Sequence, residues 1–200
     1  MNSRTEFEKW LSPIGTRIHV IGNSASGKST LARRLALTLN ANFVELDALN
    51  WLPNWVGLNE TDPDELLRRF KNATQGDKFV VAGSYTRFAK QSFWPRLDTV
   101  IWLDLPVRVL IWRVIRRSWH RWRSKELLWG TNVERFWPHL ALWRGEDSLI
   151  YWILSAQRGK RISMLEAMAD PRWAGIRFIR LTSAREIERF TASIEAMRKN

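Results

Sequence analysis

Residues 17–35 read RIHVIGNSASGKSTLARRL, a short apolar run that changes into small residues and then into a basic helical pattern. Gly22, Gly27, Lys28 and Ser29 fit the spacing G-x-x-x-x-G-K-[ST]. Glycines let such a loop curl with its backbone N–H groups pointing inward, and the N-terminus of the next helix adds the positive end of its dipole. The junction therefore predicts a loop that binds phosphate between a strand and a helix.

The predicted phosphate loop gives its polar residues distinct roles. Lys28 would reach the β and γ phosphates of ATP, Ser29 would ligate Mg²⁺, and Thr30 would be the next hydroxyl inward. A glycine-rich turn without a ligand is the alternative, which the strand before the loop and the helix after it disfavour. The predicted nucleotide-binding residues are Gly22, Asn23, Ser24, Ala25, Ser26, Gly27, Lys28, Ser29 and Thr30.

The composition fits one compact domain over residues 1–200. Hydrophobic residues make up 45% of the chain, which is enough for a full core. There is no cysteine, which excludes disulfides and thiolate metal sites. The N-terminal residues contain no apolar targeting segment, and the most apolar later run, at 99–115, is interrupted by charged residues and a proline. We expect a cytoplasmic protein with no membrane partner.

Strand and helix patterns alternate along the chain. Short runs that are mostly apolar or β-branched predict strands at 17–21, 42–46, 78–82, 99–103 and 177–181. Helical patterns occur at 28–39, 63–74, 107–123, 148–168 and 184–197. This alternation predicts an α/β fold, with a parallel sheet covered on both faces and ligands at the carboxyl ends of the strands. Residues 124–145, rich in Trp and mixed charges, are predicted to form a lid.

Much of the net charge of +12 lies in residues 112–125, which read WRVIRRSWHRWRSK. Basic residues interleaved with aromatic ones are typical of a groove for single-stranded nucleic acid, so nucleic acid is a possible partner. The alternative is an amphipathic helix with a solvated arginine face. The sequence alone leaves both interpretations open.

Two carboxylates follow the second predicted strand. Glu45 and Asp47 are two residues apart, which places them on the same side of an extended chain near the phosphate loop. Gly83, after the third predicted strand, permits a sharp exit from the sheet. These strand ends are therefore predicted to converge on the phosphate loop.

Over residues 17–190 the sequence resembles the adenylate-kinase-related proteins known as DNA topology modulation proteins. The resemblance rests on the phosphate loop, on LDALNWLPNW at 46–55, AGSY at 82–85 and VIWLDLP at 100–106, and on the Arg-rich and Trp-rich helix that follows. It implies a P-loop NTPase of the nucleoside-monophosphate-kinase type. Such a fold is a three-layer α/β/α arrangement around five parallel strands in the order 2-3-1-4-5, with a mobile lid.

The resemblance also assigns two arginines. In adenylate kinases, two arginines four apart on the helix after strand four contact the nucleotide phosphates, and Arg113 and Arg117 match that placement. Residues at i and i+4 share a helical face, so both guanidinium groups could meet the phosphoryl group in transfer. Arg116 and Arg121 match less well. The arginines near the lid, Arg144, Arg158 and Arg161, have no clear counterpart.

One departure from the family concerns the third strand. Relatives carry Asp-Gly there, whereas this chain has Ala82 and Gly83, so it lacks the carboxylate that normally holds a Mg²⁺-bound water. Either Glu45 or Asp47 replaces that carboxylate, or catalysis is slow or lost. The arginine that grips the acceptor phosphate is also displaced, and Arg87 is the nearest candidate.

Asp47 is the candidate that orients the acceptor, because phosphoryl transfer needs a group that positions the nucleophile and takes its proton. The alternative for Asp47 is a carboxylate that only caps the turn before Trp51. The aromatic residues Trp51, Trp55 and Tyr85 could line an acceptor pocket or simply pack in the core. His19, inside a strand, is predicted to be a core residue, and His120 and His139 have no metal-binding partners nearby.

Together these features predict a kinase that binds ATP with Mg²⁺ and transfers the γ-phosphoryl group to a small acceptor. The predicted catalytic residues are Lys28, Asp47, Arg113 and Arg117, and the predicted metal ligands are Ser29 and Glu45. A nucleic-acid-associated protein whose P-loop is a switch or a slow ATPase is the main alternative. A nucleotide-binding protein that has lost its chemistry through Ala82 is a third.

Overall fold

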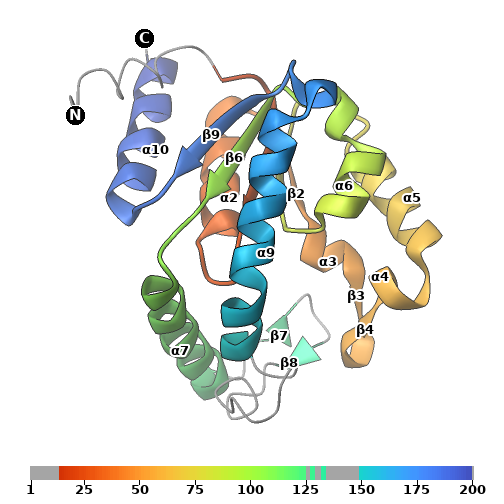
Figure 1. The fold of residues 1–200 in the computed structure, drawn as a ribbon, viewed down its shortest axis with the longest axis vertical. Coiled ribbons are helices and arrows are strands. Elements are labelled where there is room, and N and C mark those ends of the chain that lie inside the picture. The colour runs from red at the N-terminus through yellow and green to blue at the C-terminus, as the bar shows by residue number, and fades with distance from the viewer. Residues whose placement is uncertain (1–13, 125–126, 129–131, 134–148, 200) are drawn as a thin grey trace.

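The computed structural model describes residues 14–124, 127–128, 132–133 and 149–199. A sheet of five parallel strands forms its centre (Figure 1). The strands are β1 (Arg17–Gly22), β2 (Asn42–Glu45), β5 (Phe79–Ala82), β6 (Thr99–Leu103) and β9 (Arg177–Leu181). Their order in the sheet is β2-β5-β1-β6-β9, which is the predicted 2-3-1-4-5 when the five strands are numbered along the chain.

The strand register aligns the carboxyl ends of the three central strands. Val20 of β1 is opposite Ala82 of β5, and Gly22 of β1 is opposite Leu103 of β6. The segments that leave these strands therefore start at one edge of the sheet. This is the edge at which ligands bind in open parallel α/β sheets.

Helices cover both faces of the sheet, which confirms the three-layer α/β/α prediction (Figure 1). Alternate strand residues face opposite layers, so Val80 packs with α2 and α10 while Val81 packs with the other layer. One layer consists of α2 (Lys28–Leu39) and α10 (Ala184–Lys199). The other consists of α3 (Leu46–Asn50), α5 (Pro63–Ala73), α6 (Thr86–Ser92) and α9 (Leu149–Ala169).

Helix α7 (Val107–Ser124) begins beyond the carboxyl end of β6. Its buried residues Leu110 and Val114 pack with Leu105, Ala25 and Ile187. No helix in the described part of the chain is both long and apolar enough to cross a bilayer.

The remaining elements are short. They are β3 (Trp51–Leu52), η1 (Pro53–Trp55), β4 (Val56–Gly57), α4 (Leu58–Thr61), η2 (Trp94–Arg96), β7 (Leu127–Leu128), β8 (Asn132–Val133) and η4 (Pro171–Trp173). The sequence patterns predicted none of them, nor α3 and α6. Most of the predicted lid at 124–145 lies outside the described residues; within it, β7 and β8 form an antiparallel pair.

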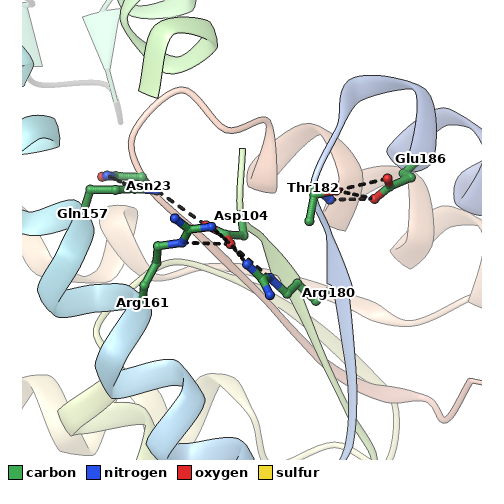
Figure 2. Close-up of polar contacts among 7 residues, drawn as sticks. All are labelled: Asn23, Asp104, Gln157, Arg161, Arg180, Thr182 and Glu186. Atoms are coloured by element: carbon green, nitrogen blue, oxygen red, sulfur yellow. Dashed lines mark hydrogen bonds and ion pairs between the residues drawn. The ribbon is translucent and has the colours of Figure 1, made fainter. Parts of the chain in front are cut away.

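The starts of α5 and α10 follow local capping chemistry. Asp62 Oδ1 accepts a hydrogen bond from the Glu65 backbone N–H at 3.0 Å, and Pro63 occupies the first turn of α5. In the first turn of α10, the Glu186 carboxylate accepts a hydrogen bond from the Thr182 backbone N–H at 2.6 Å, a contact drawn in Figure 2. The Glu186 N–H donates in return to Ser183 Oγ at 3.1 Å, which makes a reciprocal cap.

His19 is completely buried in β1, as predicted, and it links three parts of the fold. The Trp94 indole N–H donates to His19 Nδ1 at 3.0 Å, so His19 Nε2 carries the proton and donates to the Gly83 carbonyl at 3.1 Å. Burial lowers the pKa of His19 to about 3, although the bond to Gly83 acts in the opposite direction. The imidazole is therefore neutral in the folded protein at physiological pH.

His19 makes stability depend on pH. Its pKa is 6.5 unfolded and about 3 folded, so below pH 6.5 the unfolded chain binds a proton that the native protein does not. We expect the free energy of unfolding to fall by roughly 1 kcal/mol per pH unit from this residue as pH decreases from 6.5 toward 3. His19→Gln keeps a donor and an acceptor without the titration. Denaturant unfolding at several pH values from 7 to 4 gives the free energy of unfolding as a function of pH. This free energy should fall less steeply with decreasing pH in the variant, and an equal fall in both proteins would contradict the assignment.

Candidate active site

The loop between β1 and α2 has the conformation that its glycines predict. Ala25 and Gly27 have φ angles of 58° and 95°, and the Ser26 N–H donates to the Asn23 carbonyl at 3.2 Å. At Gly22, a Cβ atom would lie 2.6 Å from Ser26 Oγ. The hydroxyl of Ser26 is buried and has no hydrogen-bond partner among the described residues. The loop is thus tightly closed, with the Ser26 hydroxyl buried against Gly22.

Asn23 is the most connected residue of this loop. Its Oδ1 accepts from the Ser24 N–H at 2.9 Å and from Lys160 Nζ at 3.2 Å, and its Nδ2 donates to Gln157 Oε1 at 2.8 Å. Gln157 and Lys160 both belong to α9. The loop is therefore tied to a helix more than 130 residues away in the sequence.

Lys28 and Ser29 open α2 and face the end of β2. Ser29 Oγ donates to Glu45 Oε1 at 2.7 Å, and Arg33 lies 3.8 Å from Glu45 Oε2. Burial lowers the pKa of Lys28 below its ordinary value; Asp47 and Glu45 oppose this, while Arg117 adds to it. The Lys28 ammonium group therefore lies near two carboxylates and a second cation. An anionic ligand there would stabilise its charged form against the cost of burial.

The two predicted arginines of α7 lie against the phosphate loop. Arg113 Nη1 donates to the Ser26 carbonyl at 2.9 Å, and Arg117 Nη2 donates to Ser24 Oγ at 3.4 Å. Their spacing of one helical turn places both on the loop-facing side of α7. Arg116, by contrast, is exposed.

Asp47 is near the site, but the predicted geometry for it is wrong. Strand β2 ends at Glu45 and α3 begins at Leu46, so Glu45 and Asp47 do not share one side of an extended chain. Asp47 instead lies in the first turn of α3, close enough to Lys28 to raise its pKa. Burial raises the pKa of Tyr85, and the nearby negative charge of Asp47 raises it further.

The exit from β5 explains the role of Gly83. A Cβ atom there would lie 2.6 Å from the Leu46 Cβ, so only glycine fits against the start of α3. Next to it, Ser84 Oγ donates to the Gly22 carbonyl at 2.6 Å. Ala82 is 1% exposed and packs in the apolar core beside α2, so this position supplies no carboxylate.

Trp51 and Trp55 are brought together by the hairpin of β3 and β4. Their rings meet edge to face with centroids 5.6 Å apart, and Trp55 is partly exposed. Asn132 of β8 holds this hairpin, because its Oδ1 accepts from the Trp55 N–H at 3.0 Å and its Nδ2 donates to the Leu52 carbonyl at 3.1 Å. A residue within the predicted lid thus contacts the hairpin.

A cleft of about 70 Å³, open to solvent, lies beside the phosphate loop. Its walls include Asn23 and Ser84 from the strand ends, Asp104 after β6, and Lys160 and Arg161 from α9. The cleft therefore adjoins the loop on the side of α9.

Asp104 binds two arginines in this cleft (Figure 2). Its carboxylate is almost fully buried and accepts from Arg161 Nε and from Arg180 Nε, each at 3.0 Å. Gln157 Nε2 lies 3.5 Å from Asp104 Oδ1. This cluster joins β6, β9 and α9 beside the loop.

Sequence reasoning missed Asp104, Gln157 and Lys160. Asp104 had a usable signal, because a carboxylate directly after an apolar strand at 99–103 lies at the ligand-binding edge. No sequence pattern indicates Gln157 or Lys160, because only the packing of α9 brings them to the loop. Among the other candidates, Arg87, Arg158 and His120 are exposed, whereas Arg144 and His139 lie outside the described residues.

The part of the chain that the structure describes contains no group of three or more His, Cys, Asp or Glu residues suited to hold a metal ion. A divalent ion here would need oxygens from a bound nucleotide in addition to Ser29 Oγ and Glu45. That donor set fits Mg²⁺, which usually keeps several waters and binds through few protein groups together with phosphates.

Comparison with known proteins gives no family model and no curated protein that matches this chain. Among solved structures, it is similar to a gluconokinase from Sinorhizobium meliloti 1021 at 18% identity and a TM-score of 0.47, covering 94% of this chain and 95% of that one. It is also similar to a shikimate kinase from Acinetobacter baumannii in complex with shikimate, at 15% identity, a TM-score of 0.46 and coverage of 97% and 98%. A sugar kinase from Janibacter sp. HTCC2649 gives 18% identity, a TM-score of 0.49 and coverage of 92% and 91%.

The Asp104 cluster should stabilise the fold. Asp104→Asn removes the charge and places an amide among the N–H groups of Arg161 and Arg180, so we expect a loss of about 1–3 kcal/mol in the free energy of unfolding. Glu188→Gln is a matched control, because it neutralises a carboxylate in the exposed pair with Arg34 and should cost little. Equal denaturant midpoints for the two variants would contradict a structural role for the cluster.

Proposed function

We propose that this protein is an ATP-dependent phosphotransferase that transfers the γ-phosphoryl group to a small acceptor. The observation that carries the proposal is the convergence of two α7 arginines, Arg113 and Arg117, on the same loop as Lys28, with Asp47 beside that lysine. Phosphoryl transfer depends mainly on positioning and on stabilisation of charge, and this arrangement supplies cations for the phosphates and a carboxylate for the acceptor.

The residues at the loop fit ATP and Mg²⁺. The buried Ser26 hydroxyl lacks a partner, and the pKa of Lys28 is lowered by burial, two conditions that a bound phosphate would relieve. Ser29 and Glu45 would hold the metal, Ser29 directly and Glu45 directly or through water. When bound, Mg²⁺ would neutralise charge on the β and γ phosphate oxygens.

The protein residues would act in three ways. Lys28 would bind the β and γ phosphates, and Arg113 and Arg117 would stabilise the charge that spreads over the transferring group. Asp47, in the first turn of α3 and close to Lys28, would orient the acceptor. If the acceptor is a hydroxyl group, its oxygen forms the new P–O bond as the γ-phosphorus separates from ADP, and Asp47 takes the proton.

The resemblance to topology modulation proteins stays a prediction, because no family model matches. One observation favours a competing function, nucleic-acid binding. Trp112, Trp119 and Trp122 of α7 are 65%, 47% and 44% exposed, and the basic residues Arg108 and Arg123 are exposed on the same helix. Binding of single-stranded DNA that weakens steeply with salt, without product formation from any acceptor, would favour this alternative.

A turnover assay tests the kinase proposal directly. Labelled γ-phosphate from ATP should appear in a product when the protein is given a panel of nucleoside monophosphates, hydroxycarboxylic acids and sugars. Lys28→Ala should lower turnover by about 100-fold or more while leaving the fold intact, because it removes the cation aimed at the phosphates. Unchanged ATP affinity and turnover in Lys28→Ala would rule out the phosphate-loop assignment.

Two isosteric variants separate the roles of the carboxylates. Asp47→Asn keeps the size and shape of the side chain but cannot take a proton, so MgATP affinity should persist while transfer falls by about 100-fold. Glu45→Gln should instead raise the Mg²⁺ concentration required for half-maximal turnover by about 10- to 100-fold. Mg²⁺ titrations at saturating ATP measure both the maximal transfer rate and the Mg²⁺ concentration at half-maximal turnover. If both variants match the parent protein, these carboxylates are structural and the acceptor side of the proposal fails.

A further inference from the structure

Helix α9 covers one face of the sheet with only one of its own sides. Met164 and Ala167 are buried in the core on that side, at 3% and 1% exposed. In Figure 1, α9 crosses in front of the sheet, so its other side points toward the viewer. There Ile162 is 48% exposed and Leu165 is 49% exposed. The helix thus carries large apolar side chains on a side that the described part of the fold leaves open to solvent.

These side chains belong to a stripe of exposed residues along α9. Ile162 is its centre, and the other members lie three or four residues away, the spacing at which helical residues are neighbours. Neither of the two charged members has an ion-pair partner among the residues that the structure describes. We call this set the α9 outer stripe; its residues are Arg158, Gly159, Ile162, Leu165 and Glu166.

Gly159 is the small residue of the stripe. Glycine inside a helix is less favourable than alanine. A Cβ atom at this position would meet nothing within 4 Å, so no contact inside the described fold requires the missing side chain. What glycine does permit is the close approach of another backbone or side chain from outside.

The order of the stripe is self-complementary. When two copies of α9 pack antiparallel about a twofold axis at Ile162, position 158 of one copy faces position 166 of the other, and position 159 faces position 165. Arg158 then meets Glu166 of the other copy, and the same ion pair recurs by symmetry. Leu165 likewise meets the space left by Gly159. Charge and size both match, as an interface between identical surfaces requires.

We propose that the α9 outer stripe is the interface of a homodimer, in which two α9 helices pack antiparallel about a twofold axis near Ile162. The apolar side chains form its centre, and the two Arg158–Glu166 ion pairs fix the register. A parallel pair would set Arg158 against Arg158 and Glu166 against Glu166, so the charges select the antiparallel arrangement. The dimer does not rest on the proposed function, because no residue of the stripe belongs to the candidate site.

The dimer should be weak and reversible. The net charge of +12 repels two copies, although salt screens exposed charges beyond about 8 Å at physiological ionic strength. A contact between two helices is also smaller than a standard interface, so we expect a dissociation constant of about 10 to 100 µM. Sedimentation velocity over a series of protein concentrations, at physiological salt, measures it.

Charge reversal tests the register. Arg158→Glu and Glu166→Arg each set like charges opposite one another at both ends of the interface, so each variant alone should dimerise about tenfold more weakly than the parent protein. An equimolar mixture of the two variants pairs opposite charges again and should recover the affinity of the parent protein. The two changes shift the net charge in opposite directions, so a general charge effect cannot weaken both.

Two further variants test the centre of the stripe. Ile162→Asp should abolish the dimer, because it buries a carboxylate beside its own copy. Gly159→Gln should weaken the dimer about tenfold and yet raise the Tm of the monomer, because it fills the gap and favours the helix. Arg189→Glu, at an exposed position on α10, is the matched control and should dimerise like the parent protein. Thermal unfolding checks that each variant is folded.

Loss of affinity in each charge variant, with recovery to the parent's affinity in their mixture, supports antiparallel pairing of α9. A parent protein that stays monomeric well above the expected concentration range overturns the proposal. A dimer that Ile162→Asp leaves intact also overturns it, because another surface then holds the two copies. A mixture that stays as weak as either variant excludes the ion pairs, and one that dimerises far more tightly than the parent protein indicates parallel helices; both results overturn the proposal.

Discussion

The register of β1 between β5 and β6 is the constraint on which the rest of the site depends. Because Val20 aligns with Ala82 and Gly22 with Leu103, three loops leave the sheet side by side. The phosphate loop is then held from both neighbours: Ser84 after β5 donates to the Gly22 carbonyl, and Leu103 of β6 lies where any side chain at Gly22 would fall. A shift of one residue in this pairing would turn each strand's side chains to the opposite helical layer.

Two buried polar networks extend this constraint into the helical layers. His19 connects Trp94 to the Gly83 carbonyl and so fixes the turn that presents Ser84. On the other side, Asn23 connects through Gln157 toward Asp104, which holds Arg161 and Arg180. His19, Asn23 and Asp104 are themselves buried, and a buried polar group is generally hydrogen-bonded. They give the loop a defined position before any ligand arrives.

Charged side chains of both signs gather at the loop. Among the residues that the structure describes, Lys28, Lys160, Arg113 and Arg117 lie around it, and Glu45 and Asp47 lie near Lys28. Burial lowers the pKa of both lysines, and a neighbouring cation lowers each further, Arg117 for Lys28 and Lys28 for Lys160. Cations gathered at the carboxyl edge of the sheet favour an anionic ligand, in keeping with the phosphoryl transfer proposed above.

The sequence by itself determined the phosphate loop, the five strands and their order, and the arginine pair, because each depends on local spacing or on a family resemblance. Helical spacing predicted that Arg113 and Arg117 share a face, and α7 places that face on the loop. Only the tertiary structure decided the rest. The prediction that Glu45 and Asp47 lie on one side of an extended chain was wrong, because a short helix that propensity alone does not reveal begins at Leu46. Gly83 packs against the start of that helix. Lys160 reached Asn23 across 137 residues of chain through the packing of α9, and no local pattern encodes such a contact, because it depends on how whole layers meet.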